Sequence, residues 1–278
     1  MRYRRWIVLS TIVIYVLTLA LAVMWLLKVR EVDVRVTETS SGSTVYAECN
    51  EKLEKMLLGR KLFSVSADEI VTELEKDPYV TVKKVKRRFP DAVEVEIEER
   101  AECFAVKNEE LYYILDRDYN LLDKRTTLEK EGGAGKILPV EVKNVKLGFA
   151  AFRVGKPIAY DETGMFGYAV RLFRSLDDLN FLKSITVYGS GGEKEERIYL
   201  NTETGVSLEF RFAVPRGLSS SSKGEIAAAR NTLCDKIGEV KSAYDAFTEK
   251  QKSEGYYLVY MTDDAFSVRT EYTVRAES

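Results

Sequence analysis

The chain has 278 residues, of which 45% are hydrophobic and 31% are charged, and its formal net charge is −2 at pH 7. This composition is typical of a folded protein with one large domain or two smaller ones. The first thirty residues carry only basic charges, so the remainder is acidic, which argues against binding to nucleic-acid phosphates. The absence of histidine excludes the commonest general base and zinc ligand. The three cysteines, Cys49, Cys103 and Cys234, are far apart, which predicts no metal site and at most one disulfide bond.

The first long apolar segment is residues 6–27, WIVLSTIVIYVLTLALAVMWLL, which carries no charge. About 20 such residues span the roughly 30 Å hydrocarbon core of a bilayer. Trp6 and Trp25 stand near its two ends, where indole rings favour the membrane interface. The pattern predicts a transmembrane helix with an interfacial tryptophan at each end.

The charges that flank this segment predict its orientation. Arg2, Arg4 and Arg5 outweigh Lys28 and Arg30, so residues 1–5 are expected in the cytoplasm and everything after the helix outside it. The alternative is a cleaved signal peptide, with Ala20-Leu21-Ala22 as the cleavage site. However, the apolar run is long for a signal peptide and continues past that site. The sequence therefore favours a single-pass type II membrane protein.

Residues 31–100 predict a small α+β domain with the order strand, helix, helix, strand, strand. Residues 32–36 alternate valine with charged residues, as in a strand, and residues 46–58 have a helical apolar stripe that Gly59 would end. Residues 66–69, Ser-Ala-Asp-Glu, have the form of a capping box, in which the serine side chain accepts from the third amide while the glutamate reaches back. The second helix is expected to begin there and to stop at Asp77-Pro78.

The domain is expected to end in a hairpin with basic residues on one strand and acidic residues on the other. Val93, Val95 and Ile97 alternate with three glutamates, which predicts a strand with one buried and one wet face. On the preceding strand the alternation slips at Lys83-Lys84, as at a β-bulge. Pairing the strands would set Lys and Arg opposite Glu, so we interpret the basic run as a partner of the acidic one rather than a lipid or nucleic-acid patch.

These features resemble the POTRA domain of the FtsQ and DivIB family of bacterial cell-division proteins. The motifs that carry the resemblance follow a single membrane anchor and are, in order, residues 59–63 (GRKLF), 77–80 (DPYV), 85–90 (VKRRFP) and 95–100 (VEIEER). The resemblance implies a domain at residues 28–100 and a second, β-rich domain after it.

Residues 101–272 do predict a β-rich α+β domain, followed by a short tail at 273–278. Residues 111–116 and 121–122 flank a turn in which Asn120 could adopt the left-handed conformation. An amphipathic helix is expected over residues 166–182, and a second capping box at Ser222–Glu225 opens a helix with an apolar face through Val240. Residues 129–136 read as a flexible loop, and the predicted strands are 185–187, 198–200, 206–212, 256–261 and 265–272.

The sequence offers little for catalysis. Residues 220–223 match the SxxK nucleophile motif, but a run of serines produces it by chance, and no SDN or KTG segment accompanies it. The acidic pairs Asp177-Asp178 and Asp263-Asp264 are more often solvated than metal-binding. We therefore expect no enzyme activity, no catalytic residue, no metal and no cofactor.

The family resemblance implies a scaffold of the division machinery that regulates septal peptidoglycan synthesis by binding. The implied partners are bitopic coiled-coil proteins of the FtsL and FtsB or DivIC type, and the implied location is the cell membrane at the division septum. The last predicted strands form the candidate docking edge, with five residues expected to bind a partner: Tyr257, Tyr260, Phe266, Val268 and Tyr272. Two other functions stay open: a POTRA-type adaptor or chaperone for exported polypeptides, and a membrane-tethered cell-wall enzyme.

Overall fold

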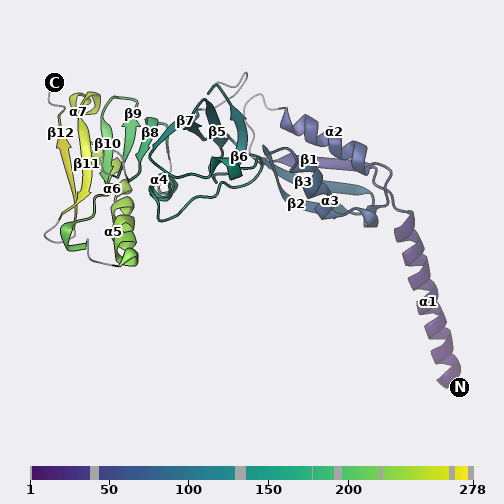
Figure 1. Cartoon of the computed structure of the whole chain (residues 1–278). Coiled ribbons are helices and arrows are strands. Elements are labelled where there is room, and N and C mark those ends of the chain that lie inside the picture. The colour runs from purple at the N-terminus through teal and green to yellow at the C-terminus, as the bar shows by residue number, and fades with distance from the viewer. Residues whose placement is uncertain are drawn as a thin grey trace. The chain divides into compact units, whose positions relative to one another are not determined.

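The computed structural model describes residues 2–37, 44–128, 136–176, 178–190, 196–218, 222–262 and 267–274 (Figure 1). In the first helix it leaves undescribed the side chains of residues 2–5, 7–9 and 24–26. The expected loop at 129–136 lies almost wholly outside the described residues. The chain forms two compact units, residues 1–101 and 102–278, and each is described by itself.

Helix α1 (Arg2–Leu26) contains most of the apolar run. The Trp6 side chain is 75% exposed, whereas the side chain of Trp25 is outside the described part. A search of the described residues for a helix with the length and apolar character of a membrane span finds none.

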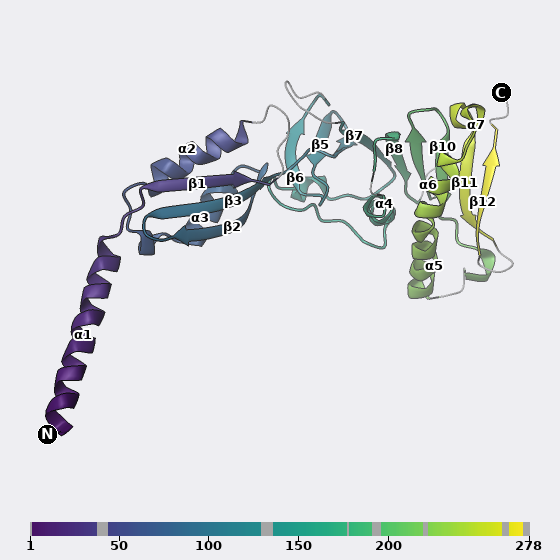
Figure 2. The same cartoon turned by 180° about the vertical axis from the view of Figure 1, so that it is seen from behind.

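The first unit contains a three-stranded sheet in the order β1-β3-β2, with β1 parallel and β2 antiparallel to the central strand. Two α-helices and a short 3-10 helix complete it, in the order that the sequence predicts (Figures 1 and 2). The elements are β1 (Glu31–Val36), α2 (Val45–Leu57), η1 (Leu62–Ser64), α3 (Ala67–Leu74), β2 (Val80–Arg88) and β3 (Ala92–Glu99).

The core of this unit lies between the sheet and the two helices. Val93, Val95 and Ile97 of β3 are fully buried, as the alternation predicts, and pack in one cluster with Leu53 of α2 and Ile70 of α3. The glutamates between them are only partly covered. One face of the sheet is therefore apolar and covered by helices, and the other is polar.

The predicted β-bulge and charge pairing are both present on the polar face. The register of β2 against β3 shifts between Val82 and Lys84, after which Lys84 lies opposite Glu96 and Lys86 opposite Glu94. Further cross-strand ion pairs join Lys83 to Glu98 and Arg88 to Glu94, the latter at 3.8 Å.

The capping box predicted at Ser66 is wrong. Ser66 is the N-cap of α3, but its side chain makes no capping hydrogen bond. Glu69 instead accepts two hydrogen bonds from the guanidinium of Arg60, at 2.6 and 3.0 Å, and these lower the pKa of its carboxyl group. Arg60, which lies outside the helix, therefore binds the glutamate that the capping-box motif would place at the helix start.

The second unit is built on a nine-stranded mixed sheet in the order β12-β11-β10-β9-β8-β7-β4-β5-β6. This large sheet with helices confirms the predicted α+β class. The strands are β4 (Phe104–Asn108), β5 (Leu111–Leu115), β6 (Leu121–Arg125), β7 (Leu138–Lys143), β8 (Leu182–Tyr188), β9 (Arg197–Thr202), β10 (Ser207–Arg211), β11 (Tyr256–Met261) and β12 (Val268–Thr273).

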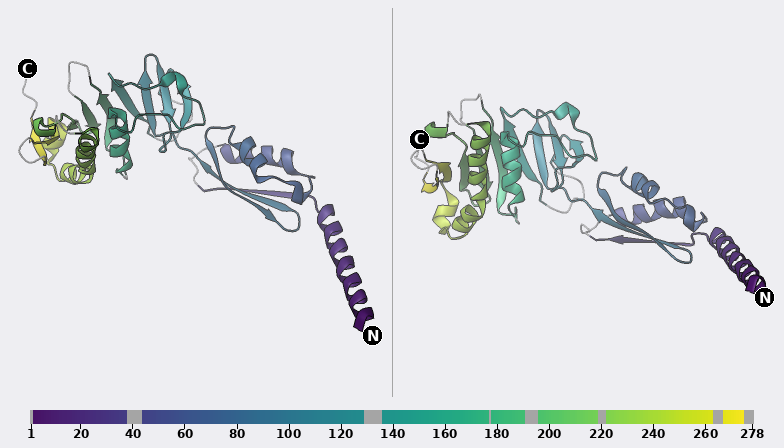
Figure 3. Two further views of the ribbon diagram at one scale, coloured as in Figure 1. Left: turned by 60° about the horizontal axis from the view of Figure 1, so that its bottom comes forward. Right: turned by 90° about the horizontal axis from the view of Figure 1, so that it is seen from below.

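The helices of this unit pack against one face of the sheet, where α4 and α5 lie side by side (Figure 3). They are α4 (Met165–Arg174), α5 (Lys223–Asp235), α6 (Ile237–Asp245) and α7 (Glu249–Ser253), with 3-10 turns η2 (Phe149–Ala151) and η3 (Arg216–Leu218). The helix expected over residues 166–182 is shorter than predicted: it stops at Arg174, and Leu182 begins β8. The helix that opens at Ser222 is interrupted at Lys236, although its predicted capping box is formed.

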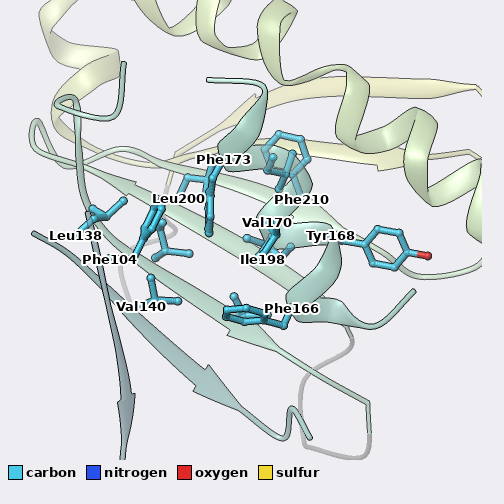
Figure 4. Packing of buried hydrophobic residues seen from close by; sticks show 14 of the residues in the cluster. Phe104, Leu138, Val140, Phe166, Tyr168, Val170, Phe173, Ile198, Leu200 and Phe210 are labelled. Atoms are coloured by element: carbon cyan, nitrogen blue, oxygen red, sulfur yellow. The ribbon is translucent and has the colours of Figure 1, made fainter. Parts of the chain in front are cut away.

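Alternate residues of the strands and one face of α4 build the core of the second unit. Phe166, Val170 and Phe173 point from α4 toward the sheet, while Tyr168 points the other way and stacks on Phe212 (Figure 4). Phe104 of β4 stacks on Phe173 with ring centres 5.3 Å apart. The helical spacing of these aromatics therefore marks core, as predicted, although the helix itself is shorter.

The turn before β6 differs from the prediction, because Tyr119 rather than Asn120 has a positive φ, of 64°. The Tyr119 ring is buried and stacks on Phe104 at 5.4 Å. Asp116 holds the turn by accepting hydrogen bonds from the backbone amides of Asp118 and Asn120. Burial of an aromatic ring thus outweighs the preference of asparagine for the left-handed region.

The three cysteines are free. Burial raises the pKa of the Cys49 and Cys103 thiols to about 11 and that of Cys234 to about 12. These thiols therefore stay protonated near neutral pH and react slowly.

Candidate docking site

Strand β12 lies at one end of the nine-stranded order, and among the described strands it pairs with β11 alone. The pairing is antiparallel and unbroken from Tyr256 opposite Thr273 to Met261 opposite Val268. No described strand pairs with its other side, which within the described residues is therefore an edge of the sheet.

The hydrogen-bond pattern identifies which backbone groups of β12 point outward. The amide of Thr262 donates to the carbonyl of Ser267 at 3.0 Å, so these opposed residues form a hydrogen-bonded pair. Hydrogen-bonded and non-hydrogen-bonded pairs alternate along an antiparallel ladder. Val268, Thr270 and Tyr272 consequently direct their N–H and C=O groups away from β11, toward the open edge.

Three of the predicted docking side chains lie on the face of the sheet that the helices cover. Tyr257 and Tyr272 are cross-strand partners, and both rings meet the Phe247 ring edge-on, at 5.2 and 5.4 Å. Val268 also packs against the core. These three side chains thus hold β12 in place, whereas the backbone N–H and C=O groups of Val268 and Tyr272 point toward the open edge.

The other two predicted docking residues do not join this cluster. Tyr260 projects from the opposite face of β11, where its hydroxyl donates to Glu271 at 3.4 Å. Phe266 lies outside the described residues. The structure therefore groups Tyr257, Val268 and Tyr272, and places Tyr260 apart from them.

Sequence reasoning missed two residues that position the edge. Phe247 follows α6 outside any helical repeat, so no periodicity identified it as the ring between the two tyrosines. Gly255 precedes β11 with φ of 91°, and a Cβ there would lie 2.5 Å from the carbonyl oxygen of Thr273. Glycine at this position permits the close approach of the two strand ends.

A buried carboxylate supports the strand beneath the edge pair. Glu209 of β10 is 4% exposed at its side chain and accepts hydrogen bonds from Arg197 at 3.0 Å and Arg211 at 2.8 Å. Glu209 lies opposite Leu258 in the parallel pairing of β10 with β11. The two arginines are themselves cross-strand partners, so the carboxylate separates two like charges.

Residues 27–100 match a family model for the POTRA domain, FtsQ-type. The chain is also similar to the cell division protein DivIB of Clostridium botulinum, with 22% identity over 198 residues that cover 65% of this chain and 72% of that protein. The DivIB proteins of Clostridium tetani and Clostridium acetobutylicum share 20% identity over 126 residues and 26% over 99.

The chain therefore contains an FtsQ-type POTRA domain and is similar to cell division proteins named DivIB. The alignments with the second and third DivIB relatives cover 44% and 38% of those proteins, respectively. The match to the family model ends at residue 100, so the docking edge in the second unit is characterised by its own geometry.

The remaining sequence motifs are structural where they are described. Ser222 accepts from the amide of Glu225 at 3.3 Å, and Glu225 accepts from the amide of Ser222 at 2.9 Å, so Ser222, the third residue of the SxxK match, is a helix cap. Ser220, the serine at the nucleophile position of the match, lies outside the described residues. Asp177, Asp263 and Asp264 lie outside the described residues. Over the described part of the chain, no three acidic or cysteine side chains converge on a common metal position.

Proposed function

We propose that this protein is a non-enzymatic, membrane-anchored scaffold of the bacterial division machinery, which binds partner proteins and regulates septal peptidoglycan synthesis. Its DivIB relatives are named as cell-division proteins, which supports a role in division. The observation that carries the binding mechanism is the β12 edge, with outward backbone groups at Val268, Thr270 and Tyr272. An extended segment of another chain would add to this edge as a further strand.

The proposed partners are bitopic coiled-coil proteins of the FtsL and FtsB or DivIC type. Anchorage in the same membrane would raise the effective concentration of partner and edge, so that a modest intrinsic affinity suffices. Tyr260 and Phe266 are proposed to add side-chain contacts beyond those of the backbone.

The anchor is proposed to be α1, from its uncharged run and the basic residues that precede it. Apolar side chains from Ile12 to Leu21 are more than half exposed, which supports a role in contact with lipid. Residues 28–278 are then expected outside the cytoplasm.

Protease added to wall-stripped cells should remove nearly everything except the anchor. A mature protein that begins at Val23 would instead establish a cleaved signal peptide.

The docking proposal is tested by moving one proline along β12 in the full chain. Val268→Pro removes an outward N–H, so we expect the fold and the melting temperature to be retained while partner binding falls at least tenfold. Arg269→Pro is the matched control, because it removes an inward N–H and should loosen the β11–β12 pair itself. Normal partner binding by a folded Val268→Pro variant would exclude strand addition at this edge.

Cellular location distinguishes the division role from the other functions. A fluorescent fusion is expected to gather at the septum of dividing cells. An even distribution around the membrane would favour an adaptor or chaperone for exported polypeptides.

A further inference from the structure

The POTRA fold of the first unit begins directly at the end of α1, with no intervening linker. Leu27, the first residue after the helix, packs partly against the POTRA core, and its carbonyl accepts from the amide of Leu62 at 3.0 Å. Val29 is 1% exposed and exchanges backbone hydrogen bonds with Arg60 and Gly59 at 2.8 and 2.9 Å. The amide of Arg30 donates to the carbonyl of Asp91 at 2.8 Å.

This junction limits the distance between the POTRA unit and a membrane that contains α1. Four extended residues, 27–30, reach at most about 13 Å. The interfacial layer on each side of a bilayer core is about 5–7 Å thick. The segments bonded to residues 27–30 therefore lie in or beside that layer.

These segments expose large apolar side chains. Leu58, Phe63 and Phe89 are 47%, 44% and 71% exposed, although they belong to an otherwise well-packed unit. Leu58 and Phe63 flank the residues bonded to Leu27 and Val29, and Phe89 is in the turn that holds Arg30. Three exposed apolar residues thus gather at the end of the unit where the anchor joins.

Two cations at the same end have no anionic partner. Lys28 and Arg30 are exposed and form no ion pair with a described residue. The neighbouring arginines differ, because Arg60 binds Glu69 and Arg88 is paired with Asp33 and Glu94. Glu31 and Asp91 also lie at this junction and form no ion pair with a described residue, so Lys28 and Arg30 are the charges there that lipid phosphates would attract.

We propose that these five residues, Lys28, Arg30, Leu58, Phe63 and Phe89, form a lipid-contact surface that seats in the headgroup layer of an anionic membrane. The proposal rests on the proposed anchor. The bilayer is the occupant because the linker-free junction brings this surface to it, and because exposed apolar rings beside basic side chains match an interface with anionic headgroups. Insertion of these residues into the headgroup layer would fix the orientation of the POTRA unit relative to the membrane.

An exposed aromatic at the other end of α2 provides a matched control. Tyr46 is 49% exposed, close to the exposure of Phe63. Residues 46 and 58 are twelve positions apart, which corresponds to about 18 Å along a helix. Tyr46 is therefore expected to remain in water when the junction is seated.

The test uses the full chain in nanodiscs of phosphatidylcholine and phosphatidylglycerol that contain a headgroup spin label. Phe63→Cys, Phe89→Cys and Tyr46→Cys are each labelled with an environment-sensitive fluorophore, and the unsubstituted chain measures the background from the three native thiols, of which Cys103 is only partly buried. We expect quenching at positions 63 and 89 to be at least twice that at 46. Lys28→Gln with Arg30→Gln should reduce this difference only when phosphatidylglycerol is present.

Each outcome separates this inference from the anchor on which it rests. Equal quenching at the three positions, in a chain that co-purifies with the discs, would overturn the lipid-contact surface and leave the anchor in place. A difference that is unchanged in pure phosphatidylcholine would overturn the role of anionic lipid. A chain that does not enter the discs would overturn the anchor and this proposal together.

Discussion

Strands β2 and β12 both lie at the edge of a sheet, but their chemistry differs. Five of the nine residues of β2 are basic, and a bulge interrupts its pairing. Only two of the six residues of β12 are charged, and its pairing is regular throughout. Charges and bulges on an edge strand oppose the addition of another strand. The β2 edge of the first unit is therefore protected against strand addition, whereas the β12 edge of the second unit is accessible to it.

The two edges also differ in what supports them. The cations of β2 pair with partly exposed acids on the polar face, in contacts that solvent screens. The β11–β12 pair, by contrast, has a buried carboxylate on the neighbouring strand β10 and packs against Phe247 on its helix-covered face. A docking edge needs a rigid base of this kind, because a strand that shifts cannot present its outward groups in register.

The largest effect is expected from Glu209→Ala, which removes the carboxylate between the two cross-strand cations Arg197 and Arg211. Loss of one partner of a largely buried ion pair costs about 3 kcal/mol, at the low end of the usual range here because Arg211 is 39% exposed at its side chain. Denaturant unfolding of the second unit measures the change.

Glu141→Ala is the control for this variant, since its side chain is 51% exposed and pairs with Lys143 at 3.2 Å. We expect it to change the free energy of unfolding by less than about 0.5 kcal/mol. Similar losses in the two variants would show that the Glu209 carboxylate does not support the docking edge.

A smaller effect is expected from the double change Glu94→Lys and Glu96→Lys on the polar face of the POTRA sheet. Glu94 pairs with Arg35 at 3.5 Å, and Glu96 lies between Arg35 and Lys84 in register. Reversal should destabilise this unit by about 1–2 kcal/mol. Hydrogen exchange of the β2 and β3 amides shows where stability is lost. Unchanged exchange rates in these strands would mean that the β2 edge does not depend on these ion pairs.

The two serines at helix starts give the next comparison. Ser222→Ala removes a formed capping box and should cost about 1 kcal/mol. Ser66→Ala removes a side chain that makes no capping bond, so we expect a change of only about 0.3 kcal/mol. Equal costs, measured by thermal melting of each variant, would contradict the distinction between the two helix starts.

The smallest effect is expected from Lys83→Gln with Lys84→Gln on β2. Exposed ion pairs contribute about 0–1 kcal/mol, so stability should change little. Binding to liposomes and to DNA should be unchanged, because these cations already face Glu98 and Glu96. A large loss of either binding in a sedimentation assay would restore a basic binding patch on β2.

Features set by neighbours in the sequence were predictable. The alternation in β3 identified its buried face, and the slip at Lys83-Lys84 located the bulge, because a strand repeats every two residues regardless of its surroundings. The Ser222 capping box formed because its partner Glu225 lies three residues away and forms no ion pair with any described residue. The family motifs in the first unit likewise lie close together along the chain.

Features that depend on distant partners were not predictable. Arg60 draws Glu69 away from the cap of α3, burial of the Tyr119 ring decides which residue adopts positive φ, and the parallel pairing of β10 with β11 brings together strands separated by three helices. The sequence by itself predicted strands at 256–261 and 265–272. Only the tertiary structure decided that Val268, Thr270 and Tyr272 turn their backbone groups outward, because strand register is set by pairing across the sheet rather than by the residues of one strand.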